Sequence, residues 1–108
     1  MSEAGNWVRV ASVADVAEGS SIAVEANGVS LAVFHLDGGE VCVTSNVCTH
    51  AFAMLTDGWL EGNVIECPLH AGQFDVRTGK GVCPPIEEDL RTYKVKLQGG
   101  DILVDLPA

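Results

Sequence analysis

Two cysteines and two histidines lie near the middle of the sequence in a pattern that can bind metal. One segment reads Cys-Thr-His at 48–50 and the other Cys-Pro-Leu-His at 67–70, with 16 residues between the second ligand and the third. Thiolate sulfur and imidazole nitrogen are the donors that zinc sites and iron–sulfur centres use. The candidate metal ligands are therefore Cys48, His50, Cys67 and His70.

Two kinds of metal site fit these four side chains. A single zinc ion would take two thiolates and two imidazoles in a tetrahedron, but zinc modules usually pair cysteine with cysteine and histidine with histidine. Here each short segment supplies one cysteine and one histidine. This arrangement favours a site with two metals, one bound by both cysteines and the other by both histidines.

The residues around the ligands resemble those of a known family. A Rieske [2Fe–2S] centre has histidines in place of two cysteines on one iron. The flanking motifs here are Asp-Gly-Trp-Leu-Glu-Gly at 57–62, Cys-Pro-Leu-His-Ala-Gly-Gln-Phe-Asp at 67–75 and Arg-Thr-Gly-Lys at 77–80. With these motifs the sequence resembles, over nearly its whole length, the Rieske-type ferredoxins that serve bacterial aromatic-ring-hydroxylating dioxygenases. One departure is Ala71, where the family often has glycine.

The resemblance implies a function as well as a cofactor. The protein would carry one Rieske-type [2Fe–2S] cluster and act as a one-electron carrier, not as an enzyme. Its electron donor would be a flavin-containing ferredoxin reductase, and its acceptor the terminal Rieske oxygenase of the system. Cys48 and Cys67 would hold one iron, and His50 and His70 the other. Two alternatives stay open: a small Rieske-like subunit of an assimilatory nitrite reductase, and a zinc-stabilised β module.

The ligand set and its neighbours predict the reduction potential. Two ferric ions, two sulfides and two thiolates make a neutral oxidised site, which accepts an electron more readily than a dianionic four-thiolate cluster. High-potential relatives have two further cysteines, which form a disulfide, and a serine that donates a hydrogen bond to the cluster. The matching positions here are Ala53, Leu69 and either Gly72 or Gln73. We therefore expect voltammetry to give a potential low in the Rieske range of about −150 to +300 mV; a value well above zero would contradict this.

The rest of the chain predicts an all-β fold that carries the ligands on loops. Glycine-containing turn signals recur at short intervals, and several of the runs between them alternate apolar with polar residues. The expected strands are 7–11, 21–26, 29–36, 40–45, 63–67, 90–97 and 101–106. The Asn27-Gly28 pair favours a type I′ hairpin turn, and residues 12–21 predict about one helical turn with Ser12 as N-cap. We expect about eight or nine short antiparallel strands in a small Rieske-type sandwich or barrel, with a loop-rich cluster-binding subdomain.

Composition bounds the domain organisation and the partners. A chain of 108 residues that is 47% hydrophobic predicts one domain, residues 1–108, with the cluster-binding loops at about 45–85. The net charge of −9 disfavours nucleic acid and anionic membranes as partners and favours a protein with a basic docking patch. The chain has neither a signal-peptide pattern nor an apolar run that could span a bilayer, so we expect a cytoplasmic protein. The carrier role that the resemblance implies predicts a monomer.

The other cysteines and the third histidine are interpreted as structural. Cys42 lies in an alternating strand, where a cysteine packs as a small apolar residue, and Cys83 precedes two prolines. His35 lies in the apolar run at 29–36 and is expected to be partly buried.

Apolar residues near the ligands have two interpretations. They shield the cluster from water, or some stay exposed and form a docking tip ringed by acidic residues. The apolar residues are Phe52, Met54, Leu69 and Pro84, and the acidic ones Asp57, Glu61, Glu87 and Glu88.

Overall fold

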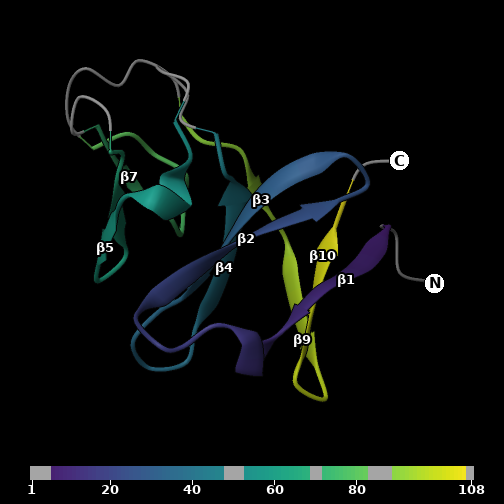
Figure 1. Ribbon diagram of the computed structural model, residues 1–108. Helices are drawn as coiled ribbons and strands as arrows, with labels where there is room; N and C mark the ends of the chain where they lie inside the picture. The colour runs from purple at the N-terminus through teal and green to yellow at the C-terminus, as the bar shows by residue number, and fades with distance from the viewer. Residues whose placement is uncertain (1–5, 48–52, 69–71, 83–88, 107–108) are drawn as a thin grey trace.

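In the part of the chain that the structure describes, ten short strands form three antiparallel sheets. The computed structural model describes residues 6–47, 53–68, 72–82 and 89–106. In these residues the strands form one four-stranded and two three-stranded sheets, and the helical elements are two 3-10 turns. Figure 1 shows β5 and β7 on one side of the molecule and β1, β9 and β10 on the other. The predicted all-β class is confirmed.

A four-stranded sheet occupies the middle of the molecule in the order β2-β3-β4-β8. Its strands are β2 (Ser20–Ala26), β3 (Val29–His35), β4 (Val41–Ser45) and β8 (Thr92–Tyr93). The β2–β3 hairpin turns at Asn27 and Gly28, whose φ angles of 52° and 78° are both positive. A type I′ turn requires this conformation at both central residues, so the turn prediction is confirmed.

A three-stranded sheet in the order β1-β10-β9 covers one face of the central sheet. Its strands are β1 (Trp7–Ser12), β10 (Asp101–Asp105) and β9 (Val95–Gln98). The 3-10 turn η1 (Val13–Asp15) follows β1, and the Ser12 hydroxyl accepts a hydrogen bond from the Ala14 N–H while Asp15 accepts one from the Ser12 N–H. Ser12 is therefore the N-cap, as predicted.

The second three-stranded sheet is built from the segment between the proposed ligand motifs and from the residues just after them. It has the order β5-β6-β7, with β5 (Trp59–Glu61), β6 (Val64–Glu66) and β7 (Gln73–Asp75). The 3-10 turn η2 (Leu55–Asp57) precedes β5. Strands β5 and β7 are absent from the sequence prediction because three residues are too few to show a periodic pattern.

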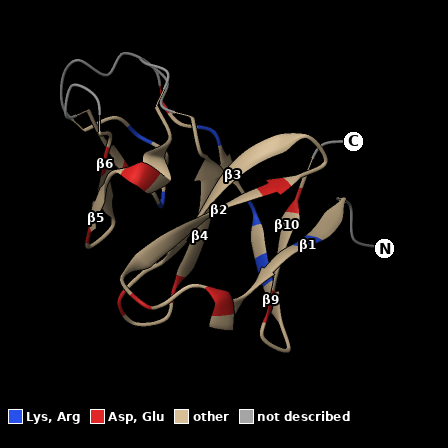
Figure 2. Cartoon of the chain, viewed as in Figure 1, with Lys and Arg blue, Asp and Glu red and all other residues tan. Residues whose placement is uncertain are grey.

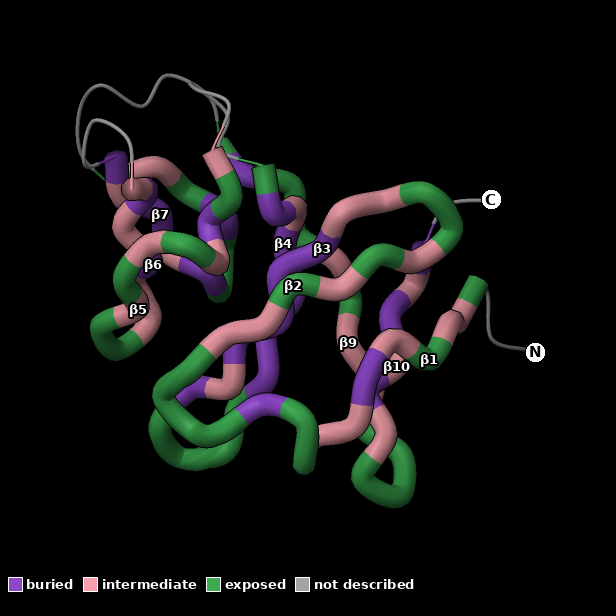
Figure 3. The backbone as a smooth tube through the Cα atoms, viewed as in Figure 1, coloured by how far each residue is buried: buried purple, intermediate pink, exposed green. Residues whose placement is uncertain are grey.

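The central sheet is apolar on both faces because a sheet covers each of them. Successive side chains of a strand point to opposite faces. On β3, Leu31 and Val33 pack in the core shared with β1, β9 and β10, whereas Ala32 and Phe34 pack in the core shared with β5–β7. All four have no exposed surface. This explains the unbroken apolar run at 31–34, and Figure 3 shows β3 and β4 as largely buried.

The single strand predicted at 90–97 is two strands. β8 pairs with β4 at Tyr93 and Thr92, and the chain then leaves β4 so that β9 pairs with β10. The change falls at Lys94, whose carbonyl accepts a hydrogen bond of 3.1 Å from the Asp105 N–H. After this change of partner Leu97 is 50% exposed. A strand that passes from one sheet to the next forms a corner between them, which strand periodicity alone does not indicate.

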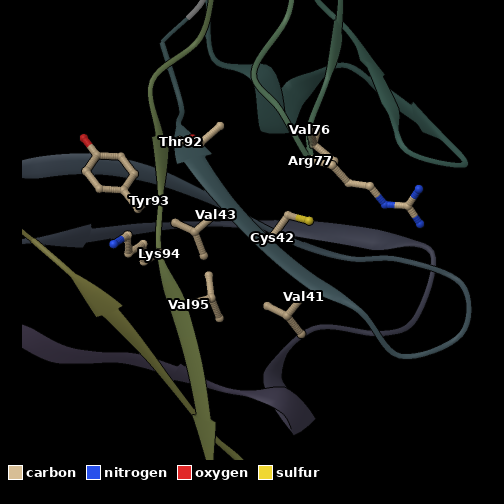
Figure 4. Close-up of a pocket in the computed structure, with 9 residues that line it drawn as sticks. All are labelled: Val41, Cys42, Val43, Val76, Arg77, Thr92, Tyr93, Lys94 and Val95. Carbon is tan, nitrogen blue, oxygen red and sulfur yellow. The ribbon is translucent and has the colours of Figure 1, made fainter. Parts of the chain in front are cut away.

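The departure of β9 from β4 leaves an open groove of about 460 Å³. Figure 4 shows its lining, in which the Cys42 sulfur lies on the side of Val76 and Arg77. The lining residues are Val41, Cys42, Val43, Val76, Arg77, Thr92, Tyr93, Lys94 and Val95.

Candidate metal centre

The segment that contains Cys48 and His50 begins and ends in paired backbone. Val47 and Met54 form an isolated antiparallel bridge, and the Leu55 N–H donates to the Asn46 carbonyl at 2.8 Å. The two ligand candidates themselves lie outside the described residues. Their flanks are therefore the two sides of a hydrogen-bonded stem.

A buried asparagine holds the two sides of this stem together. The Asn46 side chain has no exposed surface. Its amide nitrogen donates to the Thr56 hydroxyl, and its amide oxygen accepts from the Thr56 N–H, both at 3.0 Å. The sequence interpretation missed this pair, although an asparagine two residues before Cys48 and a threonine six residues after His50 are present in the sequence.

Replacing Asn46 with leucine is expected to destabilise the stem. Leucine has a similar size but leaves both polar groups of the partly buried Thr56 without their partner, at a cost of up to about 1–3 kcal/mol for each group. We expect the melting temperature, followed by circular dichroism, to fall by roughly 10 °C. The control is Ser45→Ala, which removes a neighbouring hydroxyl that accepts a hydrogen bond of 3.4 Å from the Val47 N–H. Equal melting temperatures of the two variants would contradict the role assigned to Asn46.

The segment that contains His70 is also flanked by a hydrogen-bonded stem. Cys67 is the last residue of one side of this stem, where the loop begins. The Cys67 N–H donates to the Gly72 carbonyl at 2.7 Å, and Glu66 pairs with Gln73. Cys67 is fully buried, while His70 lies outside the described residues. The β6–β7 hairpin thus places one predicted ligand at the exact start of its loop, inside the protein core.

Residues 83–88 form a third segment whose described flanks approach the same region. The Val82 N–H donates to the Gln73 carbonyl at 2.9 Å, next to the second stem. Beyond the segment, the Leu90 N–H donates to the Gly79 carbonyl at 2.6 Å. Cys83 falls inside the segment, outside the described residues, and its structural role stays a prediction.

The three segments are attached to one apolar core. Ala53 from the first stem packs against the buried cluster that contains Cys67 from the second and Leu90 from beyond the third. Phe34 of the central sheet belongs to the same cluster. The structure therefore brings Cys67 close to the stem of the Cys48–His50 segment, although 16 residues separate the two motifs.

This arrangement fits a binuclear iron–sulfur centre. Each stem carries a Cys-and-His pair in sequence, and the one candidate ligand among the described residues, Cys67, is buried in an apolar core, where a cluster would be protected from solvent. Within the described ranges, no three His, Cys, Asp or Glu residues gather to form a different metal site.

Comparison with known proteins agrees with this fit. The Rieske [2Fe-2S] domain matches residues 6–94. The chain belongs to the Rieske [2Fe–2S] family. Members of this family carry a Rieske-type [2Fe–2S] cluster, so iron–sulfur chemistry, not zinc, is the chemistry of this site. The fold prediction is confirmed at the level of the family as well.

Individual Rieske proteins match almost the whole chain. The ferredoxin component of the naphthalene 1,2-dioxygenase/salicylate 5-hydroxylase systems of a Ralstonia species is 43% identical over 94% of this chain and 96% of its own. The Sphingomonas yanoikuyae B1 ferredoxin is 44% identical with a TM-score of 0.89, over 94% of this chain and 100% of that one. A ferredoxin solved as a complex of reduced oxygenase and oxidized ferredoxin in carbazole 1,9a-dioxygenase is 35% identical with a TM-score of 0.85, over 92% of both chains.

Cys42 and His35 have the structural environments that the sequence predicts. Cys42 is 9% exposed and packs in the same core as Cys67. The His35 ring is partly buried, and its Nδ1 lies 2.9 Å from the Val16 carbonyl oxygen. Burial and the nearby Glu40 carboxylate together raise the pKa of the Cys42 thiol to about 11. A thiol that stays protonated near neutral pH is a poor metal ligand.

The thiol of Cys42 is expected to resist alkylation in the folded protein. Its pKa of about 11 lies above the ordinary 9.0, so at pH 8 its thiolate is about a hundredfold scarcer than for an exposed cysteine. Mass spectrometry after iodoacetamide treatment should find the peptide unlabelled in the folded protein and labelled in urea. Because the folded-state pKa is raised, the contribution of this thiol to stability is complete below pH 9 and is lost as the pH approaches 11. Rapid labelling at pH 8 without urea would contradict the assignment.

A shallow apolar hollow adjoins the first stem. Val47, Ala53, Met54 and Asp57 line a volume of about 350 Å³. Val47 and Met54 are 40% and 39% exposed. Of the residues predicted to form a docking tip, the structure describes Met54, Asp57 and Glu61, and the others lie outside the described residues. Met54 is exposed and lines this hollow together with Asp57, as the docking-tip interpretation expects.

Proposed function

We propose that this protein is the one-electron carrier, the ferredoxin component, of an aromatic-ring-hydroxylating dioxygenase system. The observation that carries the proposal is the near full-length match to stand-alone ferredoxins, one of which is covered over 100% of its chain. The same matches favour this function over a nitrite reductase subunit.

We propose Cys48, His50, Cys67 and His70 as the cluster ligands, with the two cysteines on one iron and the two histidines on the other. When bound, the cluster takes up and gives up one electron at a time. The protein's own part is to hold the two stems at a fixed separation and to exclude water. The Asn46–Thr56 pair fixes the first stem, and the buried Cys67 anchors the second.

The proposed partners are two larger redox proteins. A flavin-containing ferredoxin reductase would supply single electrons, and a terminal Rieske oxygenase would accept them. The complex of ferredoxin and oxygenase in carbazole 1,9a-dioxygenase supports an oxygenase as acceptor. A shuttle between two partners has to dissociate from each, so we propose a monomer, which gel filtration tests.

The remaining proposals concern organisation and location. We propose that residues 1–108 form a single domain that works in the cytoplasm. The helices of the described residues are single 3-10 turns, and none is long and apolar enough to cross a membrane.

Electron paramagnetic resonance and electron transfer test the function together. The purified protein should be red-brown, and reduction with dithionite should give the rhombic spectrum of a Rieske centre. The reduced protein should then pass its electron to an oxygenase component. A colourless folded protein that contains zinc and no sulfide would overturn the cofactor, and copurification with a nitrite reductase would overturn the carrier role.

A further inference from the structure

Among the residues that the structure describes, no strand or turn packs over the outer face of the β5–β6–β7 sheet. Its inner side chains Leu60, Ile65 and Phe74 pack in the core. The alternate residues point outward, and Trp59 among them is 62% exposed, the largest exposure of any large apolar side chain in the described residues. In Figure 1, β5 lies at the side of the molecule away from the other two sheets.

The strand register places Trp59 opposite the residue that precedes Cys67, one of the proposed cluster ligands. Trp59 pairs with Glu66, and Glu66 pairs with Gln73. Val82, whose N–H donates to the Gln73 carbonyl, continues this line and is 49% exposed. We call Trp59, Glu66, Gln73 and Val82 the Trp59 row. The Trp59 row crosses the strands at one end of the sheet. Because Glu66 directly precedes Cys67, this is the end at which the chain enters the segment that contains His70.

The same face is acidic. The second row of the sheet carries Glu61 and Asp75 on either side of Val64, and Asp57 lies just before β5. The nearby Arg77 is turned to Glu40, with an ion pair of 2.8 Å. Figure 2 shows acidic residues on η2 and β5; basic residues lie along β9 and β1 and also in the segment that follows β7, which contains Arg77 and Lys80.

The Glu66 carboxylate, in the Trp59 row, is held in place by a hydrogen bond. The Gln73 side-chain amide donates to the Glu66 carboxylate at 3.0 Å. A carboxylate oriented beside an exposed indole is ready to pair with a cation that also contacts the aromatic ring. The face therefore combines an aromatic anchor with negative charge, the two features that protein interfaces use for affinity and for steering.

We propose that this face is a docking surface for the electron acceptor, and that its occupant is a protein surface with lysine and arginine around an apolar recess for Trp59. The inference rests on the proposed carrier function. Glu61 and Glu66 attract the basic partner, and the indole of Trp59 enters the recess. This docking holds the ligand loops against the partner while one electron leaves the reduced protein and one oxidised acceptor centre gains it, without transfer of a proton.

Stopped-flow reduction of cytochrome c tests the docking surface. Cytochrome c is a convenient probe because it is a strongly basic one-electron acceptor, and the dithionite-reduced holoprotein needs no cognate partner to react with it. At low ionic strength we expect Trp59→Ala to lower the second-order rate constant about tenfold. The Glu61→Gln/Glu66→Gln double variant should lower it several-fold and flatten its dependence on salt.

Two control variants remove an exposed apolar side chain and an exposed carboxylate elsewhere on the protein. Leu97→Ala removes another half-exposed apolar side chain on β9, and Glu25→Gln removes an exposed carboxylate from β2. Both should react within twofold of the wild type, and the resonance spectra of all variants should show an intact cluster. If Trp59→Ala and the double variant react at the same rate as these controls, the docking surface is wrong. If the wild type shows no cluster signal and reduces no cytochrome, the carrier function itself fails.

Discussion

Replacing Cys67 with serine is expected to abolish the Rieske signal completely. Cys67 lies in the second stem at the point where the loop begins. It is fully buried and packs in the core that also contacts the first stem. Serine has nearly the same size, so the core loses little packing, but its hydroxyl does not ionise to replace a thiolate on ferric iron. The visible absorption and the resonance spectrum of the reduced protein should both disappear.

The control for this prediction is a second buried cysteine in the same core. Cys42→Ser makes the same atomic change at a side chain that is 9% exposed and adjoins Glu40. It should keep the full cluster content, measured as iron and sulfide per chain. Circular dichroism of both variants separates loss of the ligand from loss of the fold. A Cys67→Ser protein with an unchanged cluster would remove Cys67 from the ligand set.

Substitution of Gly79 by alanine is expected to lower the melting temperature by about 10–20 °C. Gly79 has a φ of +80°, and a Cβ atom there would lie 2.3 Å from the Leu90 carbonyl oxygen and 2.9 Å from the Thr92 side chain. The Leu90 N–H donates to the Gly79 carbonyl at 2.6 Å, so the chain on one side must move away and break this contact. Strain and overlap together cost roughly 3 kcal/mol or more.

Gly62→Ala separates the two causes. Gly62 also has a positive φ, of +62°, but nothing lies within 4 Å of its added Cβ. The Gly62→Ala substitution should lower the free energy of unfolding only by the backbone strain of about 1–2 kcal/mol. The difference between the two melting temperatures therefore measures the close approach between residue 79 and the segment after the third loop. Similar losses in both variants would show that this approach does not stabilise the fold.

Much of the architecture was predictable because its signals are local. Residues 20–35 form a hairpin whose Asn27-Gly28 turn needs only the conformations of two residues, and Ser12 caps η1 through neighbours within three positions. Strands β5 and β7 were not predicted, since each is three residues long and is stabilised by its pairing with β6. The split of the strand at Lys94 was also missed, because it depends on which sheet each half can pair with.

The sequence by itself determined which donor atoms are available and how they are grouped. Two short motifs each combine a thiol with an imidazole, and this depends on neighbours along the chain alone. Only the tertiary structure decided that the flanks of both motifs meet on one core, that Asn46 and Thr56 fix the first stem, and that Trp59 faces outward beside Cys67. These relations depend on strand register and packing between residues far apart in the chain, and short-range patterns carry no direct record of them.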